Sequence, residues 1–153
     1  MPARAPASFL NTARKALEKG IAMAVHHFEN PYGFKSDDFV PPGQIALAPE
    51  AFAEARQFLS ELEQYEHGTK WIVGFTWSRA RTMQRGHDSR SVDEGPGIDV
   101  TGYRSTEIPS EAVEVREGVP LTFIIPREQF DRAQKKEIVE TRLVSGRLSY
   151  ELR

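Results

Sequence analysis

Apolar residues recur at helical spacing in the clearest element of the chain. From Pro49 to His67 they follow one another at intervals of three and four, with charged residues at most positions between them. This period predicts an amphipathic helix with one face toward a core. Proline suits the first position of a helix and Gly68 suits its end, so both boundaries are marked. The predicted apolar stripe comprises Phe52, Ala55, Phe58, Leu59, Leu62 and Tyr65.

The N-terminal part shows a similar period followed by an irregular segment. Apolar residues from Ser8 to Phe28 predict a helix that the Ser8 hydroxyl can cap. Prolines and glycines then interrupt residues 30–43, which predicts a connector. Because this connector also carries large apolar groups, we expect it to pack across a surface of the protein. These groups are Tyr32, Phe34, Phe39 and Val40.

Short runs of β-branched and aromatic residues dominate the second half of the chain, and such residues favour strands. Turn signals at Glu117-Gly118 and Ser145-Gly146 predict two hairpins. The segment 126–136 begins with proline and carries apolar residues at helical spacing, which predicts a short helix. The predicted strands cover 45–47, 71–77, 98–103, 112–116, 119–125, 139–144 and 147–152.

Together these elements predict an α+β fold with N-terminal helices packed on a mainly antiparallel β-sheet. The expected organisation is an N-terminal helical extension and connector (1–44) and an α+β domain (45–153), packed together as a single unit. We expect the 49–67 helix to cover the strands 71–77 and 119–125, and the N-terminal helix to cover part of the opposite face. On that prediction, Phe58→Ala costs about 3–5 kcal/mol of stability.

The element order also resembles that of the HesB-like family, the A-type iron–sulfur carrier fold. The stretch Ile45–Ala51 leading into the helix is similar to the opening strand and helix of that family. The stretch 71–75 is similar to its first long strand, and Gly118–Pro126 with the elements after it is similar to its later hairpin, helix and final strands. The resemblance covers about two-thirds of the chain. The family holds its cluster on three cysteines that this chain lacks, so the resemblance implies the fold and not the cluster chemistry.

The complete absence of cysteine excludes several classes of function. Thiol nucleophiles, disulfides, zinc sites on cysteine and cysteine-held iron–sulfur clusters all need sulfur. The neighbours His26-His27 lie about 100° apart on a helix and do not converge on one ion. Asp37-Asp38 lacks the other oxygen ligands of a calcium loop. We therefore expect no metal and no cofactor.

Charge and hydropathy limit the cellular compartment and the classes of partner that we expect. The chain has 20 basic and 22 acidic residues, a net charge of −2, so no overall field attracts it to nucleic acid. No run approaches the roughly 18 apolar residues of a membrane span. The region between Arg4 and Arg14 contains no apolar signal segment, so we expect a cytoplasmic protein. Arginine supplies 14 of the 20 basic residues, which favours bidentate contacts with carboxylates or phosphates.

The candidate site is the polar segment 78–99, which follows an aromatic strand and is predicted to be a long loop. One interpretation is a surface that binds a protein or an anionic partner. The other is a solvated loop whose arginines are neutralised by Asp88, Asp93 and Glu94. The candidate residues are Trp77, Arg79, Arg81, Arg85, His87 and Arg90.

Three functions compete for this sequence. The first is a non-enzymatic binding module whose partner is a protein, with nucleic acid less favoured and no membrane contact. The second is a hydrolase or nuclease-like enzyme acting on a phosphorylated or nucleic-acid substrate, with His87 as general base. Adjacent residues such as His87 and Asp88 seldom reach the geometry of a base with its orienting carboxylate, which favours the first function. The third is a structural subunit that uses residues 28–44 as a docking arm.

Overall fold

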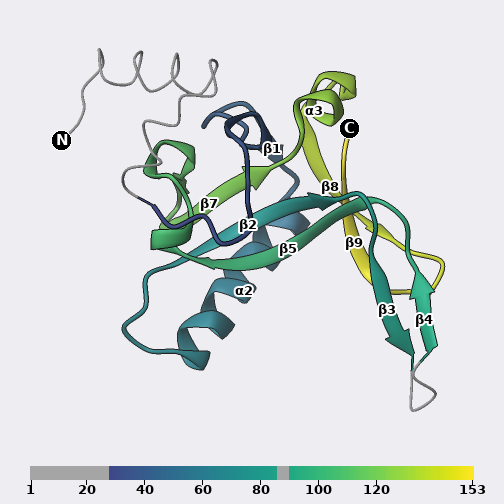
Figure 1. Cartoon of the computed structure of the whole chain (residues 1–153), viewed down its shortest axis with the longest axis horizontal. Coiled ribbons are helices and arrows are strands. Elements are labelled where there is room, and N and C mark those ends of the chain that lie inside the picture. Colours follow the sequence, from purple (N-terminus) through teal and green to yellow (C-terminus); the bar gives the residue numbers. More distant parts are fainter. Residues whose placement is uncertain (1–27, 86–89) are drawn as a thin grey trace.

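The computed structural model describes residues 28–85 and 90–153, with the backbone alone described at 83–85 and 90–92. It is an α+β fold in which a curled sheet of seven strands carries helices and a separate hairpin (Figure 1). The predicted helix from Ser8 to Phe28 lies almost wholly outside the described residues. The sheet strands are β1 (Ala46–Leu47), β2 (Trp71–Ser78), β5 (Gly97–Arg104), β6 (Glu114–Arg116), β7 (Val119–Ile124), β8 (Glu137–Arg142) and β9 (Leu148–Leu152).

The strand order across the sheet is β1-β8-β9-β5-β2-β7-β6. β2 lies near the centre and pairs along its whole length with antiparallel β5, from Trp71 opposite Arg104 to Ser78 opposite Gly97. Two neighbouring pairs, β2 with β7 and β1 with β8, are parallel, and the other pairs of the sheet are antiparallel. The predicted α+β class and the mainly antiparallel sheet are therefore confirmed.

Helix α2 (Pro49–Tyr65) covers one face of the sheet, as the helical period predicts. Ala51 and Ala55 are fully buried, while Phe58 and Leu62 of the stripe are only partly buried against the same core. The prediction is wrong for Tyr65, which is 80% exposed at the last residue of the helix. A Cβ atom at Gly102 of β5 would lie 2.7 Å from a methyl carbon of Leu62, so the glycine permits this close approach. The strand residues of this core are Val73, Phe75, Ile98, Val119, Leu121, Phe123, Ile138 and Tyr150.

The opposite face is covered by two irregular segments. The connector holds a 3-10 turn, η2 (Ser36–Asp38), and its Val40 N–H donates to the Phe123 carbonyl at 2.9 Å. The segment between β5 and β6 adds η4 (Ser105–Glu107) and η5 (Ser110–Ala112). The prediction that the connector packs on the protein is confirmed for Phe39 and Val40, while Tyr32 is 53% exposed, and the docking-arm hypothesis stays a prediction. The core of this face comprises Phe39, Ile72, Tyr103, Ile108, Ala112 and Ile124.

The sheet bends sharply between β5 and β9. These strands share one pair, Ile98 with Tyr150, whereas β8 and β9 pair at five positions. Figure 1 shows β8 and β9 steeply inclined to β2 and β5. The short helix α3 (Arg127–Arg132) follows β7 and lies near the open side of the bend, so the predicted 126–136 helix is confirmed in shorter form.

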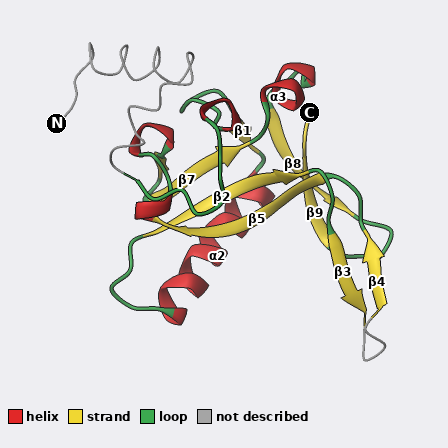
Figure 2. Ribbon diagram, in the orientation of Figure 1, coloured by secondary structure: helices red, strands yellow, loops and turns green. Residues whose placement is uncertain are grey.

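The prediction of a long loop over 78–99 is wrong. The segment forms a two-stranded hairpin of β3 (Thr82–Arg85) and β4 (Arg90–Asp93), which projects from the sheet in Figure 2. The register pairs Met83 with Val92, and among the four pairs that the structure describes in this hairpin it is the only one in which both residues are apolar. One such pair is too little for the alternating pattern that identifies a strand in sequence. No helix of the described residues is long and apolar enough to cross a membrane.

Candidate functional site

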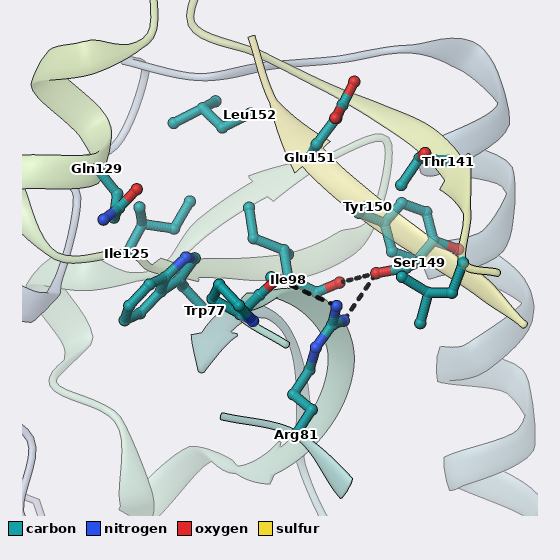
Figure 3. Close-up of a pocket in the computed structure, with 13 residues that line it drawn as sticks. Trp77, Arg81, Ile98, Ile125, Gln129, Thr141, Ser149, Tyr150, Glu151 and Leu152 are labelled. Atoms are coloured by element: carbon teal, nitrogen blue, oxygen red, sulfur yellow. Dashed lines mark hydrogen bonds between the residues drawn. The ribbon is translucent and has the colours of Figure 1, made fainter. Parts of the chain in front are cut away.

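A cleft of about 320 Å³ opens where β9 leaves β5 (Figure 3). It lies between the end of β2, the start of β5, the residue after β7, helix α3 and the hairpin β8–β9. The cleft thus results directly from the bend of the sheet, because full pairing of the two strands would close it. Six of the lining side chains matter most for its chemistry: Trp77, Arg81, Ile125, Thr141, Ser149 and Leu152.

One wall of the cleft is apolar. Trp77 is half-buried at the end of β2, where it packs against the core on one side and lines the cleft on the other. Ile125 is 1% exposed and lies beside Trp77 in Figure 3. Leu152, partly buried, lines the cleft from β9. These side chains are anchored in the core, so the wall is formed before any ligand arrives.

Arg81 forms the polar floor and is only 7% exposed. Its Nε donates to the Gly95 carbonyl at 2.9 Å, and one terminal nitrogen donates to the Pro96 carbonyl at 3.2 Å. The other terminal nitrogen donates to an Asp99 carboxylate oxygen at 3.0 Å and to the Ser149 hydroxyl at 2.8 Å. The arginine therefore fastens the root of the β3–β4 hairpin to β5 and β9.

Gly97 makes this arrangement of Arg81 sterically feasible. A Cβ atom at position 97 would lie 2.5 Å from a terminal nitrogen of Arg81, closer than real Cβ contacts. The guanidinium thus lies directly against the Gly97 backbone, where there is no side chain. In the Gly95-Pro96-Gly97 sequence, the carbonyls of Gly95 and Pro96 therefore accept hydrogen bonds from the Arg81 guanidinium, and Gly97 leaves room for it.

Ser149 links Arg81 to the sheet. Ser149 is 1% exposed, and its hydroxyl accepts from Arg81 and donates to the Ile98 carbonyl at 3.1 Å. Its only proton is therefore engaged, and the hydroxyl has no neighbouring base among these contacts. The Tyr150 hydroxyl is also kept protonated, because burial and then the nearby carboxylates of Glu54, Glu140 and Asp99 raise its pKa.

A second arginine stabilises the other side of the hairpin root. Arg147 donates to Glu94 at 2.6 Å and to Asp99 at 3.3 Å, and the Glu94 side chain is 3% exposed. The hydrogen bonds from Arg147 lower the pKa of Glu94 despite the opposing effect of desolvation. The same contact raises the pKa of Arg147. Arg81, Arg147, Asp99 and Glu94 thus form a mutually neutralised cluster.

The structure brings only part of the predicted site together. Trp77 and Arg81 line the same cleft, whereas Arg79 is exposed just after β2. Arg85 lies opposite Arg90 in the register at the far end of the hairpin. His87 lies outside the described residues, so the enzymatic hypothesis that depends on it stays a prediction. His26 and His27 are also outside them.

Several residues of the cleft and of the neighbouring charge cluster have no local signal in the sequence. Ser149 and Thr141 belong to strands of the second half, and only the bend places them opposite Trp77. Arg147 follows the predicted Ser145-Gly146 turn, which gives no indication of its pairing with Glu94. The described residues include no group of three or more His, Asp or Glu that could hold a metal ion.

No protein-family model matches the chain, and neither a curated protein nor a solved structure is significantly similar to it.

Proposed function

We propose that the protein is a non-enzymatic binding module that holds a protein partner in the cleft between β5 and β9. The observation that carries this proposal is the position of Trp77, a half-buried indole that forms a preformed apolar wall. Tryptophan is among the residues that contribute most to binding at protein interfaces. The volume of about 320 Å³ lies at the small end for ligand pockets and suits one large side chain of a partner.

The hydrogen bonds of the cleft floor support recognition over catalysis. Arg81 directs its donors at protein acceptors, and Ser149 uses its proton for the Ile98 carbonyl. A catalytic group would have to break these contacts before it acted on a substrate. As fixed groups, however, they keep the cleft in one shape, which lowers the entropic cost of binding.

The arginines of the projecting hairpin extend the proposed interface. Arg79, Arg85 and Arg90 belong to the segment whose root lines the cleft, so a partner seated there would meet the hairpin. We propose that Arg79 contacts acidic groups of the partner, whereas the contribution of Arg85 and Arg90 stays a prediction from the sequence. Arg81 is excluded from this role because its contacts are internal. Arg79→Glu is thus a better probe of binding than any change at Arg81, which would alter folding as well.

A photo-crosslinking experiment tests the cleft directly. Benzoylphenylalanine is placed at Thr141, which lines the cleft, or at Val144, which is fully exposed at the turn of the same hairpin. In the source cells, the Thr141 variant should give a discrete crosslinked protein that the Val144 variant does not give. Equal crosslinking from both positions, or none from Thr141, contradicts the proposed site.

We also propose that residues 45–153 are a divergent HesB-like domain. The succession of β1, α2 and β2, and later of β6, β7, α3, β8 and β9, supports this proposal because it follows the order on which the resemblance depends. An experimental structure superposed on members of that family provides the test. A strand order that differs from theirs would contradict it. In either case the chain has no cysteine with which to hold a cluster.

A further inference from the structure

The cleft continues into a second hollow beside α3. Gln129 and Leu152 line both spaces, so the two adjoin along the C-terminal end of β9. The second hollow has a volume of about 340 Å³ and is lined by three basic side chains and no acidic one. We call it the basic hollow; its basic residues are Arg132, Lys135 and Arg153.

The charge of the basic hollow is accessible to a ligand. All three basic residues are exposed. Arg132 contacts Glu128 at 3.2 Å and Arg153 contacts Glu151 at 2.7 Å, and the four side chains are between 46% and 70% exposed. Such solvent-exposed ion pairs contribute little and exchange readily with a competing carboxylate. An acidic ligand therefore meets positive charge at modest cost.

The strand edge between the two spaces offers backbone hydrogen bonds. Glu137 and Arg153 exchange both N–H···O bonds, at 3.2 and 2.9 Å, so they form a hydrogen-bonded pair of the β8–β9 ladder. Antiparallel pairs alternate, and the neighbouring pair of Ile138 with Leu152 is therefore the non-hydrogen-bonded kind. The N–H and C=O of Leu152 consequently point away from β8, toward the side where β5 would lie.

At this position β5 supplies no partner strand. The pairing of β5 with β9 consists of Ile98 and Tyr150 alone, and the residue that would oppose Leu152 is Pro96. Proline has no N–H, and the Pro96 carbonyl already accepts from Arg81. The edge is thus open toward the cleft at one residue, Leu152, whose N–H and C=O can pair with the backbone of an extended peptide.

From these three features we propose that the occupant is an extended acidic peptide segment of a partner protein. Its backbone pairs with Leu152, a large apolar side chain enters the cleft against Trp77, and its Asp or Glu residues lie in the basic hollow. This inference rests on the proposed binding function and specifies the kind of partner. The apolar cleft, the open edge and the basic hollow follow one another along the protein. The apolar and acidic residues of the peptide must therefore follow one another in the same order.

A random peptide library displayed on phage, selected against the full chain, tests the proposal. Selected peptides should combine a large apolar residue with two or more acidic residues at a constant spacing. A selection that yields no peptide above background, or peptides without acidic residues, overturns it.

Variants then locate the bound peptide, with fluorescence anisotropy of the selected peptides as the measurement. Arg132→Glu combined with Lys135→Glu should weaken binding about tenfold or more, because two attractive charges become repulsive. Thr141→Arg should weaken it comparably by filling the cleft. Val144→Arg adds the same charge on an exposed turn and should leave affinity unchanged. Equal affinity for wild type and the Glu variant overturns the acidic segment.

The backbone contact has its own readout. On addition of a selected peptide, the amide of Leu152 should shift in a ¹⁵N–¹H spectrum and become protected from hydrogen exchange. An unchanged Leu152 amide with a bound peptide overturns the strand pairing.

Two outcomes separate this inference from the proposed function. If crosslinking at Thr141 finds a partner but charge reversal at Arg132 and Lys135 has no effect, the binding function stands and the acidic peptide is wrong. If neither experiment finds a partner at the cleft, both are wrong. Sedimentation of the protein alone at micromolar concentration identifies the remaining occupant, a second copy of the chain, which would also overturn the proposal.

Discussion

The face of the sheet under α2 and the root of the β3–β4 hairpin are both buried, but different forces hold them. Under α2, Phe75 stacks on Phe123 with ring centres 5.8 Å apart and forms a T-shaped pair with Tyr150, with ring centres 5.5 Å apart. At the hairpin root, Arg81 and Arg147 hold carbonyls and carboxylates instead. Apolar burial is insensitive to pH, whereas the second kind of contact depends on ionisation. We therefore expect the face under α2 to be most sensitive to loss of apolar side chains, and the hairpin root to be sensitive to loss of charge and to pH.

The largest effect is expected from Phe75→Ala. Phe75 has 0% exposure, and its truncation leaves a cavity between α2 and the sheet. We expect a loss of about 3–5 kcal/mol in the free energy of unfolding, measured by urea denaturation. Val115→Ala on the edge strand β6, where the side chain is 66% exposed, is the control and should change stability by about 0.5 kcal/mol or less. A smaller loss for Phe75→Ala than for Arg81→Met would reverse the ranking of the two regions.

Arg81→Met should have the next largest effect. It removes a buried charge and leaves the Asp99 carboxylate with Arg147 as its remaining partner. Breaking a buried pair costs about 3–5 kcal/mol, and we expect about 2–3 because Asp99 is partly exposed and keeps that partner. Hydrogen exchange should accelerate in the β3–β4 hairpin and remain slow in β2 and β7.

The matched control for this change is Arg79→Met, which makes the same substitution at an exposed position two residues earlier. It should leave stability and exchange unchanged. Exchange that accelerates equally throughout the sheet in Arg81→Met would mean that Arg81 stabilises the whole fold, so the two regions would not be separable.

Phe58→Ala compares the rim of the α2 face with its centre at Phe75. The sequence alone predicts a loss of about 3–5 kcal/mol, but Phe58 is only partly buried. A partly buried side chain removes less apolar area from water on folding, so we now expect Phe58→Ala to cost about 1–2 kcal/mol of stability. Thermal denaturation beside Phe75→Ala measures the difference. Equal losses for both variants would show that the rim of this face contributes as much as its centre.

The smallest effect concerns pH and is confined to the hairpin root. Because Arg147 lowers the pKa of Glu94 in the folded protein, the unfolded chain binds more protons than the folded chain in the acid range. The stabilising contribution of Glu94 is therefore present above the unfolded pKa and is lost as pH falls through the folded pKa. When the pH is lowered from about 6 to about 3, the free energy of unfolding should fall less in Glu94→Gln than in the wild type. A steeper acid loss in Glu94→Gln than in the wild type would contradict this assignment.

The sequence predicts the apolar region far better than the polar one. The stripe from Phe52 to Leu62 has a helical period, and the 119–125 run has strand formers, so α2 and β7 are found from local pattern alone. Arg81 has no such signal, because its acceptors come from Gly95, Pro96, Asp99 and the distant Ser149. Its burial depends on tertiary contacts, which no short window of sequence contains.

The cleft could not be predicted for a related reason. It exists because β5 and β9 pair only once, and an interruption of pairing is a property of how the whole sheet curls. Trp77 could be singled out as an aromatic residue before a polar segment, yet nothing near it in sequence indicates that Leu152 and Thr141 face it. The backbone edge at Leu152 likewise appears only from the register.

The parallel pairing of β2 with β7 has a kinetic consequence. The hairpins β3–β4, β6–β7 and β8–β9 each join neighbouring strands, and such hairpins close within about 1–10 μs. β2 and β7, in contrast, are separated in the chain by several elements, including β5, so their pairing closes a long loop. Closing this loop costs entropy before its contacts form, so we expect β2 and β7 to pair more slowly than the hairpins close. Until they pair, the edge of β2 that later receives β7 remains open to pairing with other chains, so refolding yield should fall as protein concentration rises.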